Sequence, residues 1–142
     1  MSFLVLSDLE KRYGALTVVK GVNLSVDKGK LVCLLGPSGC GKTTTLRLIA
    51  GFVPADGGEI KVGGKVVSSP AGTVPPENRN MSMIFQSYAL WPHMTVAQNV
   101  AYGLKLRKFD AATIASKLDA ILSTTKLSPL AARYPSELSG GQ

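Results

Sequence analysis

The chain has 142 residues, enough for one domain, and we expect no second full domain beside it. Apolar residues make up 45% of the chain and charged residues 18%, a balance that excludes an intrinsically disordered protein. The 16 Lys and Arg outnumber the 9 Asp and Glu, and the net charge of +7 favours polyanionic partners such as nucleotides, nucleic acids or anionic membrane surfaces.

The cysteines and the apolar segments indicate where the chain resides. Cys33 and Cys40 are too few for a disulfide scaffold and have no Cys or His cluster beside them, so we expect a reducing, cytosolic setting. The longest uncharged run, residues 80–104, contains several polar side chains and is not expected to cross a bilayer. No signal peptide is predicted at residues 1–12.

The first third of the chain predicts strands that lead into a helix. Alternating apolar residues favour short strands at 3–9 and 21–26. The unbroken apolar run 31–35 is typical of a strand buried on both faces, as in a parallel sheet. A glycine-rich turn follows, and helical spacing predicts a helix over 42–50 that Gly51 ends.

The middle of the chain predicts a hairpin and one more strand. Residues 59–62 and 65–67 flank Gly63-Gly64, which is a typical two-residue hairpin turn. Residues 68–80 are rich in Pro, Gly and Ser and predict a loop, and 81–85 predict a short apolar strand.

Two helices are predicted in the last third of the chain. Thr95 is expected to open the first, with Gln98 completing a capping box. Asp110 is expected to cap the second, which carries an apolar stripe. Its stripe residues are Ile114, Leu118, Ile121 and Leu122.

The strongest motif lies between the predicted buried strand and the helix that follows it. The residues match G-x-x-x-x-G-K-[ST] in full, and strand, loop and helix follow in the order that a phosphate-binding loop requires. Glycines let backbone N–H groups turn toward phosphate oxygens, the helix N-terminus adds partial positive charge, the lysine reaches the outer phosphates and a threonine hydroxyl coordinates Mg²⁺. The residues expected at this site are Gly36, Pro37, Ser38, Gly39, Cys40, Gly41, Lys42, Thr43 and Thr44.

A second glycine-rich element ends the chain. Ser139, Gly140, Gly141 and Gln142 predict a small anion-binding turn, although the same residues are equally compatible with an ordinary glycine-rich loop. A phosphate loop alone leaves kinases, GTPases and ATPase motors open, and the second element narrows the choice.

The pair of motifs, GPSGCGKT and LSGGQ, resembles the nucleotide-binding domain of ATP-binding cassette (ABC) transporters, over nearly the whole chain. The resemblance implies an α/β fold: a P-loop NTPase (RecA-like) core with N-terminal antiparallel strands and a helical subdomain. We expect residues 1–86 to form the β-subdomain and P-loop core, and 87–142 the helical subdomain with the signature.

The resemblance also assigns roles and partners. It implies that Tyr13 stacks on adenine, that Gln86 binds Mg²⁺ or the attacking water, and that Thr43 shares the metal, with ATP and Mg²⁺ as cofactors. Ser139 to Gln142 are then expected to contact ATP held by a second copy in a head-to-tail dimer. Within the family, residues 87–96 resemble importer ATPases for sugars, polyamines and ferric iron, where this stretch borders the groove for the coupling helix of a membrane permease. The implied location is peripheral, on the cytoplasmic face of the membrane.

The sequence departs from the family pattern at its end. No apolar run followed by Asp-Glu occurs, so the second magnesium anchor and the general base of the family are not found among these residues. The resemblance therefore covers the N-terminal portion of an ATPase subunit, truncated before the Walker B strand, and we expect residues 1–142 alone not to hydrolyse ATP.

Two other functions stay open. The net charge of +7 is compatible with a non-transport ABC ATPase that acts on nucleic acid, although Lys and Arg are spread along the chain without a basic and aromatic stripe, and we expect no nucleic acid partner. A nucleotide-binding module without turnover is the other possibility. A GTPase is disfavoured because no Asn-Lys-x-Asp motif occurs.

Overall fold

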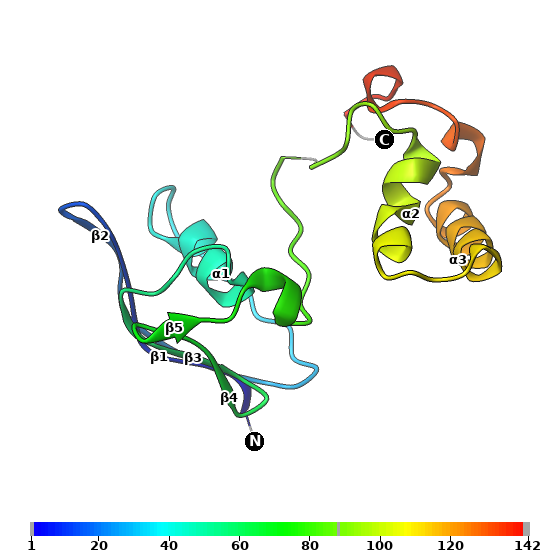
Figure 1. Ribbon diagram of the computed structural model, residues 1–142. Coiled ribbons are helices and arrows are strands. Elements are labelled where there is room, and N and C mark those ends of the chain that lie inside the picture. The colour runs from blue at the N-terminus through cyan, green and yellow to red at the C-terminus, as the bar shows by residue number, and fades with distance from the viewer. Residues whose placement is uncertain (1, 88, 141–142) are drawn as a thin grey trace. The chain divides into compact units, whose positions relative to one another are not determined.

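The computed structural model describes residues 2–87 and 89–140, and it separates into two compact units (Figure 1). Unit 1 is Met1–Ile84 and unit 2 is Phe85–Gln142. Each unit has its own packed elements and is described by itself.

Unit 1 is built on a five-stranded antiparallel sheet. Its strands are β1 (Ser2–Tyr13), β2 (Leu16–Asp27), β3 (Gly57–Val62), β4 (Lys65–Ser69) and β5 (Gly72–Thr73). The order across the sheet is β2-β1-β3-β4-β5, so β1 pairs on both of its edges. The predicted strands at 3–9 and 21–26 are confirmed and are longer than expected. The predicted hairpin at Gly63-Gly64 is also confirmed, because both glycines have positive φ and join β3 to β4.

Helix α1 (Lys42–Ala50) packs on this sheet and ends where the sequence predicts. Gly51 adopts the left-handed conformation (φ 88°) and caps the helix through its backbone N–H, as glycine commonly does at this position. Leu48 is fully buried and brings the helix into the core of unit 1. That core contains Leu6, Leu9, Val19, Leu48, Ala55 and Ile60.

Two predicted strands do not form. Residues 31–35 and 81–85 are irregular, and Leu31, Leu35 and Ile84 are 92%, 90% and 97% exposed. A strand buried on both faces requires a neighbouring strand on each edge, yet no described strand pairs with either segment, because the five strands pair only with one another. The predictions of a buried strand at 31–35, as in a parallel sheet, and of a short strand at 81–85 are therefore wrong for the described residues.

The predicted loop 68–80 is partly wrong as well. It contains the end of β4, the short strand β5 and a 3-10 helix, η1 (Pro76–Asn78). Ser68 is fully buried and its hydroxyl lies 3.1 Å from the hydroxyl of Thr73, so a side-chain pair reinforces the short β4–β5 pairing. Polar residues of a predicted loop thus form the edge of the sheet.

Unit 2 is a pair of packed helices, α2 (Val96–Leu106) and α3 (Ala111–Thr124), followed by two 3-10 helices, η2 (Ser128–Leu130) and η3 (Pro135–Glu137) (Figure 1). Both predicted caps are confirmed. The Thr95 hydroxyl accepts from the Gln98 backbone N–H at 3.3 Å, while the Gln98 side-chain oxygen Oε1 accepts from the Thr95 backbone N–H at 2.8 Å. The Asp110 carboxylate accepts from the N–H and the hydroxyl of Thr113.

In the parts of the chain that the structure describes, no helix has the length and apolar character needed to span a membrane. Strands and helices are both present, so the chain is an α/β protein in which every described strand pair is antiparallel.

Candidate nucleotide site

The loop at residues 36–41 leads directly into α1, and its glycines adopt conformations that other residues rarely reach. Gly36, Gly39 and Gly41 have φ of 154°, 83° and 91°. A Cβ on Gly36 would lie 2.7 Å from the Cys40 sulfur, and one on Gly41 would lie 2.7 Å from the backbone oxygen of Val18. The sequence therefore uses glycine where the loop closes on itself and where it touches β2.

Lys42, the first residue of α1, folds back over this loop. Its Nζ donates to the backbone oxygens of Gly36 and Pro37, both at 2.7 Å, and lies 3.4 Å from the Cys40 sulfur. The side chain thus links both ends of the loop and places an ammonium group at its centre. A phosphate that entered the loop would meet this cation and could exchange the carbonyl contacts for charge-assisted ones.

The start of α1 favours an anion. The first turn contains no acidic residue, and the N–H groups at a helix N-terminus carry partial positive charge. Thr43 is exposed at this end and Thr44 is half-buried, whereas the Thr45 hydroxyl is buried and donates to the Gly41 backbone oxygen at 3.0 Å. Thr43 is accordingly the threonine available to a metal ion, and Thr45 has a structural role.

A hollow of about 430 Å³ lies between β2 and the loop, within unit 1. Tyr13 stands at the end of β1 beside it, since Tyr13 pairs with Leu16 and Leu16 lines the hollow. The Tyr13 ring is half-exposed and has the Lys11 ammonium 5.5 Å from its centroid. The ring is therefore partly accessible at the turn between β1 and β2. The lining residues are Leu16, Thr17, Val18, Val19, Lys20, Val22, Gly39, Cys40 and Thr45.

These features fit a magnesium nucleotide. The glycines form a cradle that side chains would fill, the lysine supplies one positive charge, and the Thr43 hydroxyl is a hard oxygen ligand of the kind Mg²⁺ accepts. Among the described residues, no group of three His, Cys, Asp or Glu could hold a metal without help. A metal here would therefore share its coordination with phosphate oxygens, as Mg²⁺ commonly does.

Gln86 and the signature belong to unit 2, whereas the loop belongs to unit 1. The structure leaves Gln86 exposed at a bend, because the strand predicted to carry it does not form. Ser139 and Gly140 are also exposed, and they follow η3, whose Glu137 carboxylate accepts from the Tyr134 N–H at 2.7 Å. Gly141 and Gln142 lie outside the described residues.

The stretch from 89 to 96 presents two large apolar side chains and is held by one asparagine. Leu90 and Trp91 are 47% and 46% exposed. The Asn99 side chain donates to the backbone oxygens of Trp91, Met94 and Thr95, and accepts from the Trp91 N–H at 2.8 Å. This network fixes the path of the stretch against the first turn of α2. Tyr88, also predicted to lie at this surface, is outside the described residues.

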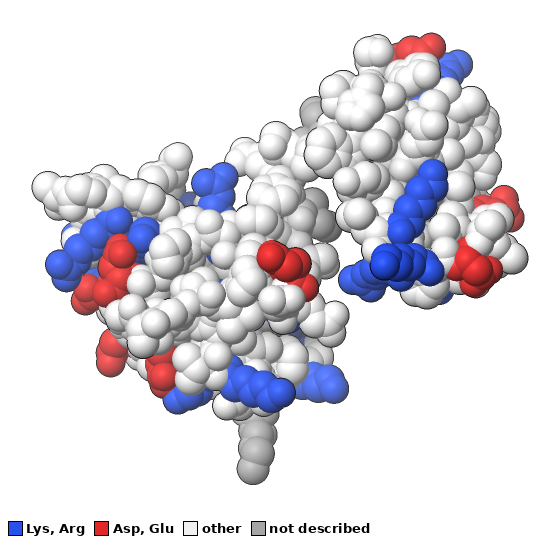
Figure 2. Space-filling model, viewed as in Figure 1, with Lys and Arg blue, Asp and Glu red and all other residues white. Residues whose placement is uncertain are grey.

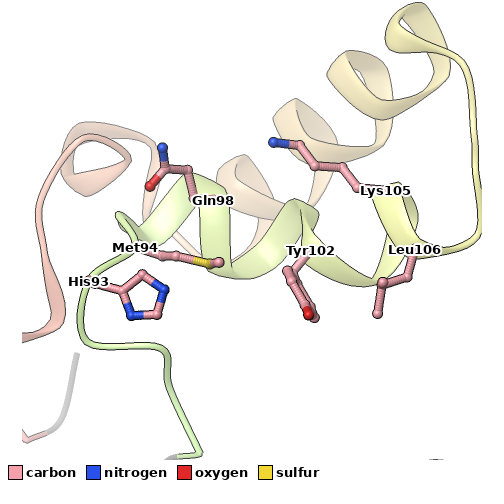
Figure 3. A pocket seen from close by; sticks show the side chains of 6 residues that line it. All are labelled: His93, Met94, Gln98, Tyr102, Lys105 and Leu106. Carbon is pink, nitrogen blue, oxygen red and sulfur yellow. The ribbon is translucent and has the colours of Figure 1, made fainter.

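A groove runs along α2 beside this stretch (Figure 3). It has a volume of about 500 Å³ and combines an apolar floor with polar and basic side chains. Trp91 flanks it, with its ring centroid 5.6 Å from that of Tyr102 and 6.1 Å from that of His93. The lining residues are His93, Met94, Gln98, Tyr102, Lys105 and Leu106.

Two residues that organise these regions were missed in the sequence. Asn99 falls inside a predicted helix, where it indicates only an exposed polar position, and Arg79 falls in a predicted loop, where it indicates a solvated charge. Arg79 is in fact 6% exposed. For Arg79 no local pattern reveals the role, because two of its partners, the backbone oxygens of Leu48 and Ile49, are about 30 residues away in the sequence. The partners of Asn99 lie within eight residues, but they form an irregular stretch without a recognised motif.

Comparisons with a family profile and with individual proteins point to the same family. The profile of the family described as ABC transporter matches residues 19–142. The sn-glycerol-3-phosphate import ATP-binding protein UgpC of Burkholderia thailandensis is 48% identical over 143 residues, which cover 100% of this chain and 39% of that protein. The spermidine/putrescine import ATP-binding protein PotA of Hahella chejuensis is 50% identical over 139 residues, covering 98% of this chain and 37% of that protein.

A second PotA, from Chromobacterium violaceum, is 46% identical over 142 residues and is covered to 38% of its length. The chain thus spans about two fifths of the length of the curated relatives it matches. Since the family profile matches most of the chain and includes both motifs, the chain belongs to the ABC transporter family of P-loop NTPase domains.

Proposed function

We propose that this chain is the ATP-binding part of an importer ATPase, in which ATP binding and hydrolysis drive solute transport through a membrane permease. The observation that carries the proposal is the glycine cradle at the start of α1 with Lys42 folded over it. The relatives are import ATP-binding proteins for sn-glycerol-3-phosphate and for spermidine and putrescine, and their names support the importer class.

In this proposal ATP enters the loop with its phosphates on the N-terminus of α1. Lys42 exchanges its carbonyl contacts for the outer phosphates, Thr43 and Gln86 share Mg²⁺, Thr44 supports the phosphates, and Tyr13 stacks on the adenine beside β2. Magnesium supplies charge neutralisation at the transferred phosphoryl group. Gln86 also orients water, which requires that unit 2 present it to the loop of unit 1.

We further propose that the partner of this chain is a second ATP-binding subunit, in a head-to-tail dimer. Ser139, Gly140, Gly141 and Gln142 then contact the γ-phosphate of ATP bound to the other copy. The exposure of Ser139 and Gly140 supports this role, because a group that acts on another chain must be accessible.

The permease is proposed to dock on the surface formed by residues 87–96 and the groove along α2. Half-exposed Leu90 and Trp91 offer apolar contact, and Lys105 adds a positive charge at the groove (Figure 3). Such a surface fits a short amphipathic segment of a partner. The protein would then lie peripherally on the cytoplasmic face of the membrane.

A nucleic acid function receives less support. On the face shown in Figure 2, Lys and Arg form several separate groups with Asp and Glu between them. Lys11, Arg12 and Lys61 are each paired with a carboxylate. A phosphate backbone is bound best by a continuous basic stripe.

The test compares the parent and two variants of the full gene product in a titration with a fluorescent ATP analogue. Lys42→Ala should weaken binding about ten- to a hundredfold, because it removes a charge-assisted contact to phosphate. Lys65→Ala, which removes an exposed lysine from β4, is the control for net charge and should bind as the parent does. Equal affinity of the Lys42 and Lys65 variants would contradict the proposal.

Ser139→Arg probes the dimer in the same titration. It should leave binding by the single subunit near normal and abolish ATP-driven dimerisation, measured by light scattering, because a bulky side chain would face the γ-phosphate of the other copy. Loss of binding by the single subunit would point instead to a site completed within one chain.

A further inference from the structure

Arg79 is a buried cation that the proposed site does not use. Its guanidinium donates to four backbone oxygens: Nε to Val74 at 2.7 Å, Nη1 to Leu48 at 2.9 Å and to Ile49 at 2.6 Å, and Nη2 to Val67 at 2.9 Å. Two of these oxygens end α1 and the other two belong to β4 and to the segment after β5. One side chain therefore ties the end of the helix to the far edge of the sheet.

The electrostatics of this contact also favour arginine. None of the ion pairs in the described part of the chain involves Arg79. Its charge lies instead against the C-terminal oxygens of α1, the negative end of the helix dipole. Burial lowers the pKa of Arg79. The planar guanidinium nevertheless directs its three nitrogens toward four backbone oxygens. A lysine keeps the charge but cannot span the four oxygens.

The absence of a side chain at Gly51 leaves room for this guanidinium. A Cβ on Gly51 would lie 2.5 Å from the Arg79 Nε and 2.8 Å from its Cζ. The glycine also has a positive φ of 88°. The helix cap and the arginine therefore form one unit, in which the missing side chain of Gly51 leaves the space that Arg79 occupies.

Helix α1 is thus anchored to the sheet at two ends. At its start, Gly41 packs on the backbone oxygen of Val18 in β2, and at its end Arg79 holds the carbonyls of Leu48 and Ile49. Because the helix has only 9 residues, a tilt imposed at one end would displace the other end as well. The hollow between β2 and the loop depends on that tilt, because Gly39, Cys40 and Thr45 form one of its walls.

We propose that Arg79 is a positioning residue for nucleotide binding: by clamping the C-terminal end of α1 to the β4–β5 edge, it sets where the phosphate loop stands over β2. The inference rests on the proposed function, since it concerns the affinity of the loop for a nucleotide. Arg79 itself contacts no phosphate and acts through the helix.

The test measures nucleotide affinity and thermal stability separately, in the full gene product. Arg79→Met and Arg79→Lys are titrated with a fluorescent ATP analogue at a temperature where circular dichroism shows each variant folded. We expect affinity to fall about tenfold in Arg79→Met and less in Arg79→Lys, because a loosened support displaces the loop from its binding geometry. Arg47→Met is the matched control: it removes an exposed arginine from the same helix and should leave affinity unchanged.

The outcomes separate the two proposals. Parent affinity in a folded Arg79→Met, with only a lowered melting temperature, would overturn the positioning role, because a purely structural residue changes stability and not affinity. If Arg79→Met fails to fold, Arg79→Lys decides in the same way. Unchanged binding by Lys42→Ala in the same series would instead overturn the proposed function, whatever Arg79 does.

Discussion

The two units of this chain hold their functional residues by different means. In unit 1 the loop is shaped by backbone: glycines at positive φ, a helix N-terminus and carbonyls that accept from Lys42 and Arg79. The sheet beneath it joins residues far apart in sequence, as in the pairing of Leu6 with Ile60. In unit 2 each helix begins at a cap whose hydrogen-bond partner is three residues away, Thr95 with Gln98 and Asp110 with Thr113.

The hydrophobic cores of the two units also differ, and the core of unit 1 contains more buried apolar residues among those described. Unit 1 buries Leu6, Leu9, Leu48 and Ile60 almost completely, whereas the buried apolar residues described in unit 2 are Val96, Ala101 and Leu122. A site that must recognise phosphate by backbone geometry needs a rigid support. A surface for a partner can be held locally and can adjust when the partner binds. The division of stability therefore follows the division of tasks that we propose.

The largest expected effect tests whether the units are stabilised independently. Leu48→Ala should cost unit 1 about 2–5 kcal/mol, because Leu48 is fully buried between α1 and the sheet. Trp91 is the only tryptophan of the chain and lies in unit 2, so urea unfolding followed by its fluorescence reports on unit 2.

Leu48→Ala should shift the unfolding transition seen by circular dichroism and leave the Trp91 transition in place. Leu122→Ala, which truncates a buried leucine in α3, should shift the Trp91 transition and serves as the matched variant. Coincident shifts in both signals would show that the units unfold together and would contradict their independent stabilisation.

A smaller effect is expected at Asn99. Asn99→Ala removes all four hydrogen bonds to the 91–95 stretch and leaves backbone groups without partners, at a cost of about 1–3 kcal/mol to unit 2. The Trp91 emission should also shift to longer wavelength as the stretch becomes more exposed. Asn78→Ala, at an exposed position in unit 1, is the control and should change neither signal.

Local signals in the sequence predict much of this molecule, and the misses share one cause. The glycine-rich turn before α1, the Gly63-Gly64 turn, the Gly51 stop and the caps at Thr95 and Asp110 each depend on residues a few positions apart. Residues 31–35 and 81–85 have strand composition, but a strand forms only where a neighbour pairs with it. Arg79 was missed for the same reason, since Leu48 and Ile49 become its neighbours only in the folded chain.

The smallest expected effect concerns the charge at the start of α3. Hydrogen bonds from the Thr113 hydroxyl and then from its backbone N–H lower the pKa of Asp110 below the usual 3.8. The folded state therefore favours the carboxylate, so this contribution to stability is present above the unfolded pKa and is lost as pH falls through the folded pKa.

Asparagine is an equally good cap but does not titrate. Asp110→Asn should thus unfold at a slightly lower urea concentration than the parent at about pH 6, and the difference should vanish at about pH 2. Trp91 fluorescence is the appropriate signal, because the other carboxyl with a lowered pKa, Asp56, lies in unit 1. A difference that stayed constant across this pH range would show that the Asp110 charge contributes nothing to the cap and that the hydrogen bonds alone hold the start of α3.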